Sequence, residues 1–198
     1  LITVGSGTQS YDGGDGTDTL IVDTSYVTSL HPDYPNIIDI DLIFGELGQK
    51  ENSVRRDTIT NIENVTYNGL FDARIYGNDQ TNIINGGSGN DIINGQGGDD
   101  YLYGREGDDT ILLGGSGNAY LDGGEGIDTF RVGLQNMDWP KTDDPNNLVN
   151  YKYTVDLEQE IAGNDTVVNF ENVDYFGEYD SEITGDEKDN FISSGSGD

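Results

Sequence analysis

Aspartate recurs at one position of a nine-residue repeat, and this regular spacing is the feature of the sequence that could do chemistry. The eight units begin at Gly13, Gly77, Gly86, Gly95, Gly104, Gly114, Gly123 and Gly185. Their sixth positions are Asp18, Asn82, Asp91, Asp100, Asp109, Ala119, Asp128 and Asn190. Carboxylates stacked at this spacing repel one another unless a divalent cation lies between them. Because Ca²⁺ accepts about 6 to 8 oxygen ligands in a tolerant geometry, the repeat predicts several structural calcium sites.

The overall charge points to the same class of ligand. Nine Lys and Arg residues face 38 Asp and Glu residues, which gives a formal net charge of −29. A chain this acidic repels nucleic acid and anionic membranes and attracts cations. Only 33% of the residues are hydrophobic, which approaches the composition of a disordered protein. We therefore expect bound cations to help the chain fold.

Other chemistries lack the residues that they need. The chain has no cysteine, which excludes disulfides, thiolate metal sites and cysteine nucleophiles. Its apolar runs are short and broken by aspartates, which excludes a membrane-spanning helix. Neither H-E-x-x-H nor G-x-S-x-G occurs, and the single histidine, His31, has no catalytic partner near it. Acidic pairs such as Asp99-Asp100 lie in turns rather than in apolar pockets, so we expect no enzymatic activity.

The nine residues of a unit divide into a loop and a strand. Six residues rich in Gly and Asp make a tight turn, and the last three make a short strand whose middle side chain points inward. That inward position, the eighth, is apolar in every unit: Leu20, Ile84, Ile93, Leu102, Ile111, Leu121, Phe130 and Ile192. Two units form one coil, so a loop stacks on the loop of the next coil. This predicts an all-β parallel β-roll with Asp91, Asp109 and Asp128 along one edge and Asn82, Asp100 and Ala119 along the other.

A longer period divides the chain into two copies of one module. The motif at Gly13 matches the motif at Gly123, an offset of 110 residues, and Asp57 to Val65 matches Asp165 to Val173 at an offset of 108. We predict a first copy at residues 1–112 and a truncated second copy at 113–198, joined in one solenoid. Residues 21–56 and 131–164 interrupt the nonapeptides with alternating apolar segments, which predict strands that extend the roll or cover its edge. Because the second copy stops within a turn, we expect the chain to be a fragment.

The unit Gly86-Gly87-Ser88-Gly89-Asn90-Asp91-Ile92-Ile93-Asn94 resembles the G-G-x-G-x-D-x-U-x nonapeptide of the RTX, or haemolysin-type calcium-binding, repeat family. The resemblance implies a right-handed parallel β-roll and a larger bacterial protein that is secreted or lies on the cell surface. It also implies export by type I secretion machinery and folding triggered by extracellular calcium. The ligands that it implies are the carboxylates of Asp18, Asp91, Asp100, Asp109 and Asp128, the side chain of Asn82, and carbonyls near Gly87, Gly89, Gly95, Gly97, Gly104 and Glu106.

Departures from the family pattern predict uneven sites. Ala119 and Gln9 supply no anionic ligand, so ions beside them should be weak or absent, whereas the loops at Gly86 and Gly104 should bind most tightly. Two other functions stay open on the sequence. The inserted segments around Tyr34 and Trp139 could bind glycans or a host cell surface, as in an adhesin. Alternatively, the chain could be the accessory domain of a secreted enzyme.

Overall fold

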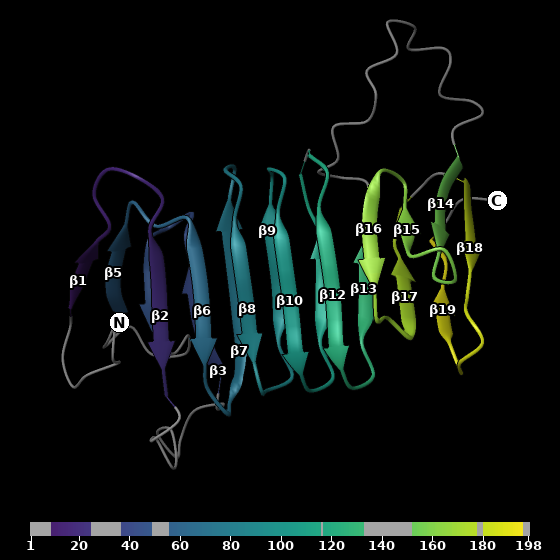
Figure 1. Ribbon diagram of the computed structural model, residues 1–198, viewed down its shortest axis with the longest axis horizontal. Helices are drawn as coiled ribbons and strands as arrows, with labels where there is room; N and C mark the ends of the chain where they lie inside the picture. The colour runs from purple at the N-terminus through teal and green to yellow at the C-terminus, as the bar shows by residue number, and fades with distance from the viewer. Residues whose placement is uncertain are drawn as a thin grey trace, which may run out of the picture.

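The computed structural model is a long, flattened roll of two stacked sheets (Figure 1). It describes residues 9–24, 37–48, 56–115, 117–132, 152–177 and 180–195. These residues contain strands, turns and bends but no helix, which confirms the all-β prediction. Within them, accordingly, no helix is long and apolar enough to cross a membrane.

The described strands form two sheets, of ten and nine strands. The ten-stranded sheet runs, in spatial order, through β1 (Ser10–Asp12), β5 (Arg56–Thr60), β4 (Glu46–Gly48), β3 (Ile37–Asp41), β7 (Asp72–Asn78), β9 (Ile92–Gln96), β11 (Thr110–Leu113), β13 (Thr129–Val132), β17 (Asn172–Tyr175) and β19 (Phe191–Ser193). The nine-stranded sheet runs through β18 (Asp180–Thr184), β14 (Lys152–Asp156), β15 (Ile161–Ala162), β16 (Asp165–Val168), β12 (Tyr120–Glu125), β10 (Tyr101–Glu106), β8 (Ile83–Gly87), β6 (Asn64–Asn68) and β2 (Thr19–Asp23). Successive nonapeptides alternate between the sheets, so each coil contributes one parallel strand to each.

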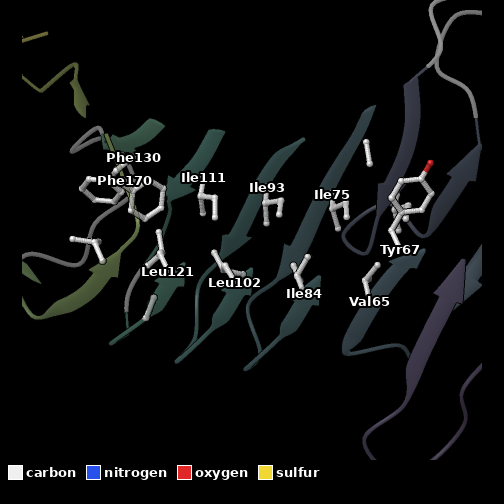
Figure 2. Close-up of a cluster of buried hydrophobic side chains, with 14 of the residues drawn as sticks. Val65, Tyr67, Ile75, Ile84, Ile93, Leu102, Ile111, Leu121, Phe130 and Phe170 are labelled. Atoms are coloured by element: carbon white, nitrogen blue, oxygen red, sulfur yellow. The ribbon is translucent and has the colours of Figure 1, made fainter. Parts of the chain in front are cut away.

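The core is a double row of eighth-position side chains between the sheets, from Leu20 to Phe130; the prediction of an inward eighth position is wrong for the last unit, where Ile192 is 42% exposed. Figure 2 shows Ile84, Leu102 and Leu121 of the nine-stranded sheet facing Ile93 and Ile111 of the ten-stranded sheet. All five are at most 1% exposed. Their parallel partners are in register, as for Leu102 with Ile84 and Leu121, so identical positions stack along the roll. Burying one such aliphatic side chain is worth about 1.5–3 kcal/mol, which makes this row the main apolar contribution of each coil.

The inserted segments enter the sheets and make the roll locally antiparallel. In the first half, β4 pairs antiparallel with both β3 and β5, and β5 then pairs parallel with β1. In the second half, β15 pairs antiparallel with both β14 and β16, and β16 pairs parallel with β12. The prediction that these segments contribute strands is therefore confirmed, but the roll is not wholly parallel, because each insertion folds back on itself before the coils resume.

Corresponding strands of the two halves lie in opposite sheets. β1 and the insertion β3 to β5 belong to the ten-stranded sheet, whereas β12 and the insertion β14 to β16 belong to the nine-stranded sheet. Outside the insertions each strand crosses to the other sheet, and an odd number of crossings separates β1 from β12. Each insertion thus widens a different face of the roll.

Candidate metal centres

The loops turn on residues with positive φ at the second and fourth positions of the nonapeptide. In the unit from Gly86 to Asn94, Gly87 has φ 115°, and in the next two units the fourth-position residues Gly98 and Gly107 have φ 118° and 117°. This region favours glycine, because a Cβ there crowds the backbone. Gln96 and Arg105 nevertheless adopt it, with φ 69° and 89°. The sharp turns expose consecutive backbone groups at the edges of the roll, where an ion can be bound.

The first glycine of each loop leaves space for the aspartate of its own loop. A Cβ added to Gly104 would lie 2.2 Å from Oδ2 of Asp109 and 2.3 Å from the carbonyl oxygen of Gly123, the first residue two units later. At Gly86 the corresponding distances are 2.5 Å to Oδ2 of Asp91 and 2.8 Å to the carbonyl oxygen of Gly104. A carboxylate oxygen and a carbonyl oxygen of the next coil therefore converge on the same place, and only glycine permits this approach.

Hydrogen bonds join the sixth positions into a ladder along each edge. On one edge the amide of Asp91 donates to Oδ1 of Asp109 at 2.7 Å, and the amide of Asp109 donates to Oδ1 of Asp128 at 2.8 Å. On the other edge the amide of Asn82 donates to Oδ1 of Asp100 at 2.9 Å. One oxygen of each of these aspartates is thus used within the protein, and it orients the carboxylate along the edge.

The second oxygen of the aspartates on the first edge has no partner among the described residues. Oδ2 of Asp91, Asp109 and Asp128 is buried and accepts no hydrogen bond. The three residues are 1%, 1% and 0% exposed. Leaving an ionised carboxylate oxygen buried and unpaired is costly, so each one requires a cation or a proton.

The pKa values express the same requirement. Burial raises the pKa of Asp91 to about 9, that of Asp100 and Asp109 to about 7, and that of Asp128 to about 6. In each case one backbone hydrogen bond opposes the shift, while neighbouring carboxylates add to it. No cationic side chain of the described residues is among the causes that set the pKa of Asp91, Asp100 or Asp109, so an ion from solution is the group that fits these three.

The chemistry of the donors suits calcium. Carboxylate and carbonyl oxygens are hard ligands, and Ca²⁺ accepts many of them without strict geometry. Within the part of the chain that the structure describes, no group of three or more His, Cys, Asp or Glu side chains could hold a metal ion by itself. A site at these loops would therefore combine a few carboxylate oxygens with backbone carbonyls of two stacked loops.

Each edge is interrupted where a unit lacks its aspartate: Ala119 lies on the second edge, whereas Gln9 precedes β1 of the ten-stranded sheet and lies on the first. The amide of Ala119 donates to Oδ1 of Asp165 at 2.7 Å, and the amide of Gln9 donates to Oδ1 of Asp57 at 2.8 Å. Asp165 lies at the start of β16 and Asp57 lies in β5, so the insertions supply the missing acceptors. Burial raises the pKa of Asp165 to about 6.

In each half of the chain, a glutamate from outside the nonapeptides ends one of the hydrogen-bond ladders. The amide of Asp18 donates to Oε2 of Glu63 at 2.8 Å, and the amide of Asp128 donates to Oε2 of Glu171 at 3.0 Å. The nonapeptide pattern predicts no role for either glutamate or for Asp57 and Asp165. The signal that could have found them is the repeated motif that begins at Asp57 and at Asp165, which contains all four residues.

The remaining predicted ligands lie at the loops, but the structure does not set all of them beside the aspartates. Gly95 does lie there, because a Cβ on it would be 2.2 Å from Oδ2 of Asp100. Gly87 and Gly89 instead approach the preceding coil, where a Cβ on Gly89 would lie 2.4 Å from the carbonyl oxygen of Phe71. Gly104 lies beside Asp109, as described above. The other predicted positions lie in the same turns or strand ends: Asp18, Asn82, Gly97 and Glu106. His31, Tyr34 and Trp139 lie outside the described residues.

Comparison with known families bears on these coils directly. A family model described as the RTX calcium-binding nonapeptide repeat (four copies) matches residues 76–111 and 112–136. The chain carries RTX calcium-binding repeats. The matched RTX residues run from the end of β7 through β13 and include Asp91, Asp100, Asp109 and Asp128. No curated protein matches the sequence. The resemblance drawn from the nonapeptides is thus confirmed, and the architecture is that of an RTX β-roll.

Proposed function

We propose that the chain is a structural module of a larger secreted or surface protein and that it folds when it binds calcium. The observation that carries this proposal is the row of buried aspartates, Asp91, Asp109 and Asp128, whose Oδ2 atoms have no partner within the described protein. An ion between adjacent loops would neutralise them and bridge successive coils. The RTX repeats in the same loops support calcium as that ion.

The proposal couples folding to export. Without cations, 38 acidic side chains repel one another and the buried aspartates oppose collapse, so the chain stays unfolded. Outside the cell, calcium binds the folded form only and shifts the equilibrium by mass action. Type I secretion machinery, acting on the parent protein, is the export route that fits this sequence of events. We assign the chain no catalytic role.

The proposed ligands are those of stacked loops. We place the tightest site between the loops at Gly86 and Gly104, with the carboxylates of Asp91 and Asp109 and with carbonyls of both turns. Weak or absent ions are expected beside Ala119, because this residue brings no carboxylate to its loop. Glycan binding through Tyr34 or Trp139 remains a prediction of the sequence.

We also propose that residues 1–112 and 113–198 are two copies of one module. Paired hydrogen bonds support this division. Nδ2 of Asn61 donates to Oδ1 of Asp12 at 2.7 Å, and Nδ2 of Asn169 donates to Oδ1 of Asp122 at the same distance. Asn61 and Asn169 also share a positive φ, of 54° and 56°.

The decisive experiment is a calcium titration of the EDTA-treated chain, followed by far-UV circular dichroism. A cooperative transition from coil to β-structure with calcium, absent at the same concentrations of magnesium, is the expected result. A chain that is fully β-structured in EDTA and does not respond to calcium would overturn the proposal.

A further inference from the structure

The ladder of aspartates on the first edge ends at a glutamate from outside the nonapeptides. The amide of Asp128 donates a hydrogen bond to Oε2 of Glu171, just as the amide of Asp109 donates one to Oδ1 of Asp128. A carbonyl also recurs, since a Cβ on Gly123 would lie 2.2 Å from the carbonyl oxygen of Asn169 and 2.7 Å from Oδ2 of Asp128. The junction between Asp128 and Glu171 therefore repeats the oxygen arrangement found between two nonapeptide loops.

This junction needs a positive charge as much as the others do. Asp128 is completely buried, and its Oδ2 has no hydrogen-bond partner. Glu171 adds a second carboxylate, whose side chain is only 15% exposed. Two carboxylates at one place, one of them buried, remain ionised together only beside a cation.

Lys188 brings a positive charge to this junction through Glu171, with its own side chain 55% exposed. Its Nζ lies 2.7 Å from Oε1 of Glu171, the oxygen that the amide of Asp128 does not use. The hydrogen bond to Glu171 is the main cause that raises the pKa of Lys188, and the charges of Asp186 and Asp128 add to it. The Lys188 backbone is fixed by a 2.9 Å hydrogen bond from its amide to Oδ1 of Asp186.

The first half of the chain has the same junction without a lysine. The amide of Asp18 donates a hydrogen bond to Oε2 of Glu63, and Oδ2 of Asp18 is buried without a hydrogen-bond partner. The residue that corresponds to Lys188 is Gln80, because its amide donates to Oδ1 of Asn78 at the same 2.9 Å. A glutamine has no charge to offer, so among the described residues nothing neutralises this pair.

We propose that Lys188 takes the place of a calcium ion at the Asp128–Glu171 junction, whereas the Asp18–Glu63 junction, with Gln80, binds a calcium ion. The inference rests on the proposed calcium binding of the stacked loops and extends it to a junction built by the insertions. In the second half, the ladder thus ends at the ammonium group of Lys188. In the first half, it ends at a bound calcium ion.

The test is the number of calcium ions bound per chain. It is measured by equilibrium dialysis against saturating calcium followed by metal analysis. Lys188→Gln should bind one ion more than the wild type, and Gln80→Lys should bind one ion fewer. Arg131→Gln is the matched control, because it removes a positive charge from an exposed pair with Asp174 and should leave the number unchanged. Circular dichroism in calcium verifies that each variant is folded.

The outcomes separate the inference from the function on which it rests. A wild-type chain that binds no calcium would overturn both. A wild type that binds calcium, with the same number of ions in Lys188→Gln, would overturn the role of Lys188 and leave calcium-dependent folding intact. The Gln80→Lys variant tests the inference independently, since an unchanged number of ions there overturns the predicted site at Asp18 and Glu63.

Discussion

Asp91 and Asp109 are 18 residues apart in sequence, yet the amide of Asp91 donates a 2.7 Å hydrogen bond to Oδ1 of Asp109. Asp91 in turn accepts a 2.7 Å hydrogen bond from the amide of Ala73 in the preceding coil. Each aspartate thus fixes the turn before it and is oriented by the turn after it. An ion that orders one loop therefore orders the ligands of its neighbours, and we expect calcium binding to be cooperative along the roll.

Asp109→Asn should weaken calcium-dependent folding strongly. The asparagine side chain keeps an oxygen that can accept the hydrogen bond from the amide of Asp91, but it carries no negative charge. We expect the calcium concentration at the midpoint of the circular dichroism transition to rise about tenfold, equivalent to about 1.4 kcal/mol. Asp108→Asn is the control, because it removes the same charge from an exposed neighbour and should change the midpoint less than about twofold. Equal shifts in both variants would mean that only net charge matters.

In EDTA, acid should partly replace calcium. Burial raises the pKa of Asp91 to about 9 and that of Asp109 to about 7, whereas the pKa of an unfolded aspartate is near its ordinary value of 3.8. Between these values the folded chain binds more protons than the unfolded chain, so the free energy of unfolding falls as pH rises through this window. We expect more β-structure in EDTA at pH 5 than at pH 8, measured by circular dichroism.

A pair of double variants separates this effect from general charge repulsion. Asp91→Asn with Asp109→Asn removes two buried titrating groups and should flatten the pH dependence in EDTA. Asp99→Asn with Asp108→Asn removes two exposed carboxylates and should leave the pH dependence in place. A wild-type chain that gains β-structure from pH 5 to pH 8 in EDTA contradicts the burial argument.

Local properties of the nonapeptide explain why so much of the roll could be predicted. Turn residues and a strand period of two are properties of a few consecutive residues, so the inward direction of Ile93 and its stacking on Ile111 follow from sequence alone. The same register sets Asp91 beside Asp109 on one edge. The coils from β7 to β13 needed no long-range information.

The role of Glu171 could not be predicted in the same way. It reaches Asp128 from 43 residues away, and only after β14, β15 and β16 have folded back into the sheet. The register of such an insertion depends on antiparallel pairing that no short motif specifies. For the same reason the sequence did not indicate that Asp165 replaces the acceptor missing at Ala119.

Ile93→Ala should destabilise the calcium-bound roll by about 2–5 kcal/mol, because it leaves a cavity between the sheets. Ile93 is fully buried, whereas its neighbour Ile92 is 36% exposed on the outer face. Ile92→Ala removes the same atoms and should cost less than about 1 kcal/mol. Urea unfolding in saturating calcium measures both. Similar losses in the two variants would contradict the assignment of Ile93 to the core.

Gln96→Gly should stabilise the roll. Gln96 occupies the second position of its loop with φ 69°, where Gly87 and Gly124 stand in other units. A side chain in this left-handed region costs about 1–2 kcal/mol relative to a right-handed one, and glycine avoids most of that cost. We expect a gain of about 1 kcal/mol in the free energy of unfolding in calcium, measured with urea. Thr110→Gly in β11 is the control, since glycine within a strand should destabilise instead. A lower free energy of unfolding for Gln96→Gly would contradict the argument that the positive φ of Gln96 destabilises the roll.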